Sequence, residues 1–197
     1  MLKVAVTGNV ASGKSLVQKY MEKFDIPTAD ADEICRNLLA NDEAVIEKVK
    51  QAFSGFDIME NGVISRKKLS NLIFSNSEQK KILEEIIHPK VREEIEGYIE
   101  DYKGKRFVVV FIPLLFESGM DSMFDKIILI SAEQDIRLER LMNRNALSRK
   151  AAMRIISSQR REEEKVPDCD FVIYNNNSPN ELYEQVDAVL KKLMNTH

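Results

Sequence analysis

The sequence predicts a three-layer α/β/α fold, with a parallel sheet between two layers of helices. Short apolar segments of strand length alternate with longer segments whose apolar residues recur at helical spacing. Phe107 to Ile112 is an almost unbroken apolar run, as expected of a strand that is covered on both faces. With 197 residues, the chain is long enough for one domain with a substantial core.

The elements can be placed in order along the chain. The predicted strands are 2–7, 26–29, 107–112, 126–130 and 171–174. Helical patterns dominate residues 32–102, and they are interrupted at Asn61-Gly62, a dipeptide typical of a tight turn. Later helices have three predicted start signals: a capping box at Ser131 and Gln134, an N-cap at Ser148, and a capping box at Ser178 and Glu181 with Pro179 between.

The composition is that of a soluble globular protein, 44% hydrophobic and 31% charged. No apolar run approaches the roughly 18 residues that cross a membrane, and the N-terminus lacks a signal-peptide layout. Cys35 and Cys169 are far apart and read as free thiols of a reducing compartment, so we expect a cytoplasmic location. The net charge of −3 argues against a general nucleic-acid binder. We therefore expect neither a nucleic-acid nor a membrane partner.

The segment GNVASGKS, from Gly8 to Ser15, fits the pattern G-x-x-x-x-G-K-[ST] of a phosphate-binding loop. It lies directly between a predicted strand and a predicted helix, as such a loop requires. Gly8 and Gly13 allow successive backbone N–H groups to turn toward phosphate oxygens. Lys14 is expected to reach the β- and γ-phosphates, and Ser15 to ligate Mg²⁺. The sequence therefore predicts that the chain binds a nucleoside triphosphate.

The loop alone does not decide what the nucleotide is used for, because switches, motors and kinases share it. The chain lacks the N-K-x-D element that reads guanine in GTPases. It also lacks a clear Asp or Glu at the end of the strand 107–112, where many motor ATPases hold a metal-linked carboxylate. These two absences favour a kinase.

Asp30 and Asp32 follow the second predicted strand, near the place where an acceptor would face the γ-phosphate. A carboxylate there can accept the proton of an attacking hydroxyl or help to hold the metal ion. The same residues are also common helix caps. The pattern alone leaves both interpretations open.

Arginines are concentrated between residues 137 and 161. Arg137, Arg140 and Arg144 recur at spacings of three and four and so share one helical face. A solvated charged face is the ordinary explanation of such a pattern. Lysine is scarce in this stretch, however, and arginine is suited to bidentate phosphate contacts. We therefore predict a lid that clamps phosphates.

Several motifs together resemble the dephospho-CoA kinase family over nearly the whole chain, from Val4 to about Ser178. They are TGNVASGKS (7–15), DADEICR (30–36), HPKVR (88–92), IPLLFESG (112–119), RLERLMNR (137–144) and DFVIYNN (170–176). The resemblance implies a P-loop kinase fold in a single domain, 1–197, with a helical acceptor-binding insertion at about 32–103 and an arginine-rich lid at about 137–165. It also implies transfer of the γ-phosphoryl group of ATP, with Mg²⁺, to the ribose 3′-hydroxyl of dephospho-CoA.

The resemblance also implies roles for individual residues. Asp32 would be the general base, with Lys14 and Arg140 supporting the transferring phosphate. The residues implied in binding ATP are Gly8, Ala11, Ser12, Gly13, Lys14, Ser15, Leu16, Arg144 and Asn175. The acceptor side would comprise Asp32, Arg36, His88, Arg92 and Glu117, and Ser15 would be the metal ligand. From the residues alone, His88 is a histidine at a helix entry before Pro89, Asn175 lies in a turn, and the PLLFE segment is a buried turn.

The sequence departs from the family pattern at two places. Asn9 and Ala11 stand where the loop commonly has glycine, and Phe111 stands where many members have an aspartate that helps to hold Mg²⁺. Two alternatives stay open: a nucleoside or nucleotide kinase of the same fold, and a nucleotide-dependent switch without a small-molecule acceptor. We expect a monomer or a weak homo-oligomer.

Overall fold

The computed structural model describes residues 1–195. Its chain forms two compact units. The first, which we call the sheet unit, contains residues 1–30 and 99–195 of the described chain. The second, the helical unit, is Ala31–Tyr98.

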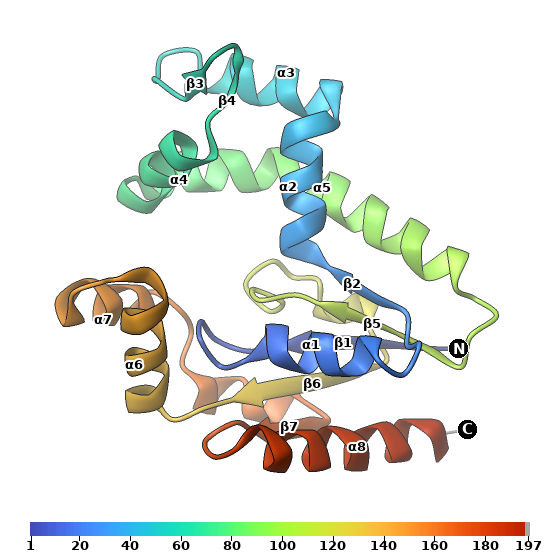
Figure 1. Ribbon diagram of the computed structural model, residues 1–197. Helices are drawn as coiled ribbons and strands as arrows, with labels where there is room; N and C mark the ends of the chain where they lie inside the picture. Colours follow the sequence, from blue (N-terminus) through green and yellow to red (C-terminus); the bar gives the residue numbers. More distant parts are fainter. Residues whose placement is uncertain (196–197) are drawn as a thin grey trace. The chain divides into compact units, whose positions relative to one another are not determined.

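The sheet unit is built on a parallel sheet of five strands in the order β2-β5-β1-β6-β7. The strands are β1 (Leu2–Thr7), β2 (Thr28–Asp30), β5 (Phe107–Phe111), β6 (Lys126–Ser131) and β7 (Phe171–Tyr174). Figure 1 shows β6 running beside β1, with β7 at the edge. The predicted parallel sheet is confirmed, although its second strand begins two residues later than the apolar pattern suggested.

Helices α1 (Lys14–Glu22) and α8 (Pro179–Asn195) pack against the sheet and close its main hydrophobic core. Every residue of β5 is buried, which explains its unbroken apolar run. Phe111 at its end is 2% exposed and belongs to this core. Phe111 is therefore a packing residue, and its side chain cannot supply the metal-linked carboxylate of the family pattern.

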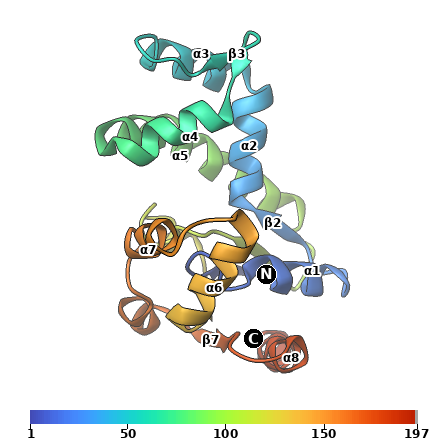
Figure 2. The same ribbon diagram turned by 60° about the vertical axis from the view of Figure 1, so that its left-hand side comes forward.

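Helices α6 (Gln134–Asn145) and α7 (Arg149–Ser157) form a hairpin between β6 and β7 (Figures 1 and 2). Leu138, Leu141, Ala152 and Ile156 make a small core of their own. Three short 3₁₀ turns complete this unit: η1 (Asp121–Met123), η2 (Glu162–Glu164) and η3 (Val166–Asp168).

Two of the three predicted helix starts are confirmed. Oγ of Ser148 accepts a hydrogen bond from the Ala151 N–H at the start of α7, and Oγ of Ser178 accepts one from the Glu181 N–H at the start of α8. The capping box at Ser131 is wrong, because α6 begins after Glu133 and the Ser131 hydroxyl instead donates to Glu162, 2.6 Å away.

The helical unit contains α2 (Ala31–Asn41), α3 (Glu43–Ala52), α4 (Arg66–Ser75) and most of α5 (Ser77–Asp101). Strands β3 (Met59–Glu60) and β4 (Val63–Ile64) form a hairpin whose turn is Asn61-Gly62. Both turn residues have positive φ, 50° and 81°, so the predicted tight turn is confirmed.

Helix α5 continues through Pro89. The interpretation of His88 as a helix-entry residue is therefore wrong, because the helix begins at Ser77, well before the histidine. Among residues 1–195, no helix is long and apolar enough to cross a membrane.

Candidate active site

The phosphate loop leaves β1 and enters α1, and its two glycines are required by their surroundings. A Cβ on Gly8 would lie 2.3 Å from the carbonyl oxygen of Ile130, and one on Gly13 would lie 2.1 Å from Nδ2 of Asn175. Both glycines also have positive φ, 154° and 106°. The loop is therefore packed tightly against the ends of β6 and β7, which holds its backbone in one place.

Ala11 adopts the left-handed conformation, with φ 62°. An alanine carries a modest steric cost in this region of φ/ψ space. Its side chain, with that of Val10, packs on the small core between α6 and α7. Val10 and Ala11 therefore give the loop apolar contacts with the lid.

Lys14 and Ser15 stand at the start of α1, as the motif predicts. The ammonium group of Lys14 donates hydrogen bonds to the carbonyl oxygens of Gly8 and Asn9. Ser15 is exposed in the first helical turn, which contains no acidic residue. A helix N-terminus without nearby carboxylates favours an anion. Within the described chain, Oγ of Ser12 is buried and has no hydrogen-bond partner.

Arg140 on α6 is joined to the phosphate loop through Asn175, which follows β7. Nη2 of Arg140 donates to the carbonyl oxygen of Asn175 at 3.0 Å, and Nδ2 of Asn175 donates to the carbonyl oxygen of Ser12 at 2.7 Å. In residues 1–195, Nη1 of Arg140 is buried and lacks a partner. A buried guanidinium nitrogen without a partner has free donor capacity for an anion.

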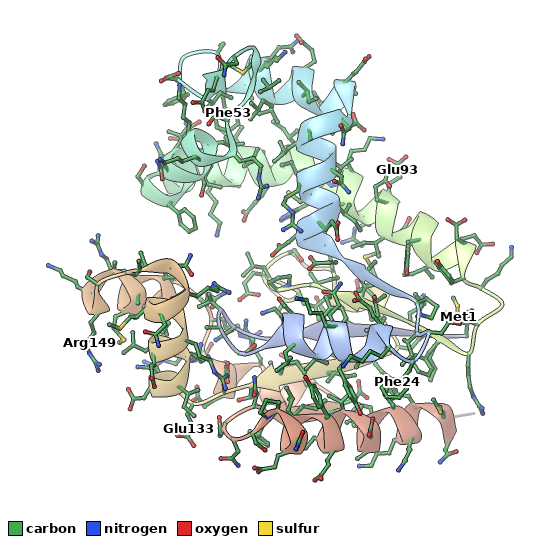
Figure 3. The ribbon with its side chains drawn as sticks, in the orientation of Figure 1. Met1, Phe24, Phe53, Glu93, Glu133 and Arg149 are labelled. Carbon is green, nitrogen blue, oxygen red and sulfur yellow. The ribbon has the colours of Figure 1, made fainter. Side chains whose placement is uncertain are left out.

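The other arginines of the α6 face have different surroundings. Arg137 is 6% exposed; its Nε donates to the carbonyl oxygen of Ala132 at 3.0 Å and lies 3.5 Å from Oε1 of Glu162. Arg144 is exposed and bonds to Asn145. Figure 3 marks Arg149 at the start of α7, among the side chains of the lid. A shared helical face therefore holds one internal, one half-buried and one exposed arginine.

Glu117, in the turn after β5, is paired with a residue that the sequence analysis did not single out. Nζ of Lys165 lies 3.0 Å from Oε1 of Glu117, and the lysine side chain is 0% exposed. Leu115 in the same turn is fully buried, whereas Glu117 is exposed and the other residues of the PLLFE segment are half-buried, so the prediction of a buried turn holds for Leu115 alone. Lys165 follows three glutamates, and such a charged stretch ordinarily indicates a solvated surface.

The residues predicted for the acceptor side lie mostly in the helical unit. A cavity of about 470 Å³ opens between α2, α4 and α5. Asp32 and Arg36 line it, together with Arg66 and Lys67, which the sequence analysis did not find. The apolar part of its wall is formed by Leu39, Leu69, Ile73 and Leu83. The cavity thus combines cationic groups, one carboxylate and an apolar surface.

His88 and Arg92 lie along α5, outside the residues that line this cavity. Burial lowers the pKa of His88 below its ordinary value, and the nearby Arg92 and Lys80 act in the same direction against Glu84. Burial and the nearby Asp32 carboxylate raise the pKa of the Cys35 thiol, whose side chain lines the cavity. Both groups are therefore biased toward their neutral forms.

Comparisons with known proteins give the family. The family model described as dephospho-CoA kinase matches residues 2–181. The chain belongs to the dephospho-CoA kinase family. A dephospho-CoA kinase of Bacillus anthracis is 38% identical over 191 residues, which cover 96% of each chain.

Two solved structures share the fold of this dephospho-CoA kinase family member. A crystal structure from Thermus thermophilus superposes with a TM-score of 0.82 at 31% identity, covering 98% of this chain and 97% of that one. A dephospho-CoA kinase from Campylobacter jejuni superposes with a TM-score of 0.71 at 34% identity, covering 97% and 96%. The three-layer P-loop kinase fold and the resemblance drawn from the motifs are both confirmed. The predicted class of enzyme, a phosphotransferase, is confirmed with them.

Proposed function

We propose that this protein transfers the γ-phosphoryl group of ATP to the ribose 3′-hydroxyl of dephospho-CoA, giving coenzyme A and ADP. The observation that carries the proposal is the junction of Arg140, Asn175 and the phosphate loop in a member of this family. It brings a lysine, a helix N-terminus and a buried arginine nitrogen without a partner, among the described residues, to one place. Such a set suits the charge of a transferring phosphoryl group.

On the ATP side, Lys14 and Arg140 offset negative charge on the transferring group. The backbone N–H groups of the loop hold the phosphates, and Ser12 Oγ offers a further donor. The complete proposed ATP set is Gly8, Ala11, Ser12, Gly13, Lys14, Ser15, Leu16, Arg140, Arg144 and Asn175. The side chain of Asn175 donates a hydrogen bond to the loop backbone. Its proposed effect on ATP is therefore through the loop and not through a contact with the adenine base.

On the acceptor side, Asp32 aligns the 3′-hydroxyl and accepts its proton. Arg36, with Arg66 and Lys67 on the same cavity, offers positive charge to the diphosphate of dephospho-CoA, and the apolar wall offers contact to its uncharged arm. His88 and Arg92 complete the proposed set on α5. Glu117 belongs to this proposed set as well, and it also forms an ion pair with Lys165.

The two remaining assignments concern larger segments. We assign acceptor binding to the helical unit, Ala31–Tyr98, which corresponds to the predicted insertion at about 32–103. We assign lid motion to the α6–α7 hairpin and the segment that follows it, about 137–165. Closure of a lid excludes water, which otherwise competes with the hydroxyl for the γ-phosphoryl group.

The donor groups of the loop fit a Mg²⁺ ion that is held mainly by ATP. Mg²⁺ is commonly bound through one or two protein groups with substrate phosphates and waters. Ser15 has its hydroxyl exposed at the start of α1 and is the proposed protein ligand. When bound, the ion would supply positive charge that offsets the charge developing on the transferring phosphoryl group. We further propose a cytoplasmic enzyme that acts as a monomer or weak homo-oligomer on ATP and dephospho-CoA, without nucleic-acid or membrane partners.

The test is ADP release by the purified protein with MgATP, with dephospho-CoA compared against AMP, CMP, dTMP and adenosine. We expect ADP only with dephospho-CoA. Asp32→Asn should lower kcat by about 100-fold or more while ATP affinity stays nearly unchanged, as for loss of a general base. Glu33→Gln, one residue along the same helical turn, is the matched control and should retain activity.

The outcomes separate the alternatives. ADP release with a mononucleotide in place of dephospho-CoA would keep the kinase chemistry and overturn the acceptor. ATP hydrolysis that no acceptor changes would favour a nucleotide-dependent switch. Near-normal turnover of Asp32→Asn would remove Asp32 from the base role.

A further inference from the structure

We infer that Lys165 is a positioning residue for the phosphates of ATP, because it fixes the phosphate loop through the side chain of Asn9. The inference rests on the proposed role of Lys14 in holding those phosphates. Lys165 lies at the C-terminal end of the proposed lid, in the segment that joins the α6–α7 hairpin to β7, far in sequence from the loop. The partners of its ammonium group are Asn9 and Glu117, so Lys165 would act on the phosphates through another residue.

Lys165 is completely buried, and its ammonium group has two partners. Nζ donates to Oδ1 of Asn9 at 2.9 Å and lies 3.0 Å from Oε1 of Glu117. Removing an ammonium group from water is costly unless charge and hydrogen bonds compensate for it. Because both partners are needed to compensate, they also fix the position of the lysine and, in turn, of Asn9.

The side chain of Asn9 is held at both ends. While Oδ1 accepts from Lys165, Nδ2 donates to the carbonyl oxygen of Arg160 at 3.1 Å. The next residue is tied to the same segment, since the N–H of Val10 donates to Oε1 of Gln159 at 2.8 Å. Three hydrogen bonds thus join the start of the phosphate loop to residues 159–165.

The path from Lys165 ends at the proposed catalytic lysine. The carbonyl oxygen of Asn9 accepts a hydrogen bond from Nζ of Lys14, 3.1 Å away. A shift of the Asn9 backbone would therefore move an oxygen that orients Lys14. The link to Lys165 depends on the side chain of Asn9, which a glycine at this position would lack.

A second contact supports the same junction. The guanidinium of Arg160 lies over the ring of Phe116, 5.6 Å from the ring centroid, next to Glu117 in the chain. The turn after β5, the segment after the α6–α7 hairpin and the phosphate loop are thus joined at one place, with Lys165 at its buried centre. This arrangement pre-organises the loop before ATP binds.

The test compares Lys165→Met, Asn9→Gly and the double variant in the full chain. Calorimetry gives the affinity for MgATP. Steady-state kinetics at saturating dephospho-CoA give kcat and the KM for ATP, and circular dichroism gives Tm. We expect Lys165→Met to lower kcat/KM for ATP by about 10-fold or more, as for a small misplacement of a reacting group. Asn9→Gly should change the same parameters, and the double variant should be no worse than Lys165→Met, because one path carries both effects.

The matched control is Lys126→Met. Lys126 is the first residue of β6, and its Nζ lies 2.7 Å from Oδ1 of Asp170 in another ion pair. The variant should leave the ATP parameters unchanged. If Lys165→Met changes Tm alone, or if Asn9→Gly leaves ATP affinity and kcat/KM at the wild-type values, the inference is overturned.

Loss of the buried lysine also leaves the Glu117 carboxylate without its partner, and Tm should fall for that reason. In Lys165→Met with Glu117→Gln the unpaired charge is gone, so Tm should recover while the ATP defect persists; the Glu117→Gln single variant gives the baseline. Recovery of the ATP parameters together with Tm would mean that Lys165 serves folding alone. Calorimetry with MgATP needs no acceptor, so it tests this inference even if dephospho-CoA is not the substrate.

Discussion

Nδ2 of Asn175 donates a hydrogen bond to the carbonyl oxygen of Ser12, 2.7 Å away, and thereby joins the end of β7 to the phosphate loop. The same residue accepts a hydrogen bond from Arg140 through its own carbonyl oxygen. Asn175, which is 5% exposed, thus connects Arg140 of the lid to the phosphate loop and sets the distance between them.

Replacing Asn175 should therefore weaken ATP binding as well as folding. Asn175→Ala removes the donor to Ser12 and should reduce the free energy of unfolding by about 1–3 kcal/mol, the usual effect of leaving a buried polar group without its partner. Denaturant unfolding and calorimetry with MgATP measure the two effects. Asn176→Ala, at a neighbouring half-buried position, is the control; equal ATP affinity in both variants would contradict the bridging role.

Arg140→Ala and Arg137→Ala should separate catalysis from folding. Arg140 is joined to the phosphate loop through Asn175, so its loss should lower kcat far more than Tm. Arg137 is bonded internally to Ala132 and close to Glu162, so its loss should lower Tm by several degrees. A large fall in Tm for Arg140→Ala, with normal turnover of the remaining folded protein, would assign it to structure instead.

His88 should make stability depend on pH in a narrow range. Burial holds its pKa in the folded protein below the ordinary value of about 6.5, so the unfolded chain binds more protons between the two values. The contribution is complete above about pH 6.5 and is lost as pH falls toward the lowered pKa. Tm should fall less steeply from pH 6.5 to 5 in His88→Gln than in the wild type. Parallel curves for the two proteins would refute this.

Cys35 offers a label for the cavity of the helical unit. The pKa of its thiol is raised by burial and by Asp32, so alkylation should be slow at pH 7 and accelerate as the pH rises. Dephospho-CoA should slow alkylation of Cys35. Cys169, in the sheet unit, has a pKa raised to about 11 by burial and by Asp168 and Asp170, and it serves as the internal control. Mass spectrometry gives both rates, and equal protection of the two thiols would argue against binding at the cavity.

Replacing Ala146, the residue that ends α6, should make the protein more stable. It ends α6 in the left-handed conformation, with φ 50°, and is exposed. Ala146→Gly should raise the free energy of unfolding by about 1 kcal/mol, because glycine adopts this conformation without steric cost. Ala188→Gly, at an exposed position inside α8, should lower it by about as much. A loss of stability in Ala146→Gly would show that its methyl group is needed.

The sequence predicted most of the sheet because the signal for its strands is local. Val108, Val109 and Val110 are consecutive and buried, so their apolar run could be read without knowing what covers it. Pro89 misled the interpretation of His88 because proline is unfavourable inside an isolated helix. In the folded chain, buried residues on both sides of it, Ile87 and Val91, continue the apolar face of α5. Packing of that face outweighs the lost hydrogen bond.

The residues of the candidate site also fall into two groups, those that a local motif predicts and those that only the folded chain brings together. The phosphate loop was predictable because its function depends on a contiguous motif. Lys165 was not, because its burial depends on Asn9, 156 residues away in sequence, and on Glu117. Arg66 and Lys67 were missed for a similar reason: only the folding of α4 against α2 and α5 brings them to a cavity.

The chain leaves the sheet for the helical unit after β2 and returns to it at β5, and these two strands are direct neighbours, with Asp30 paired to Phe111. An insertion that departs from and rejoins adjacent strands does not interrupt the hydrogen bonding of the remaining sheet. Natural variation can then lengthen, shorten or replace the inserted helices while the machinery that handles ATP is inherited intact. The choice of acceptor can therefore change with the inserted helices, while the sheet and the phosphate loop stay as they are.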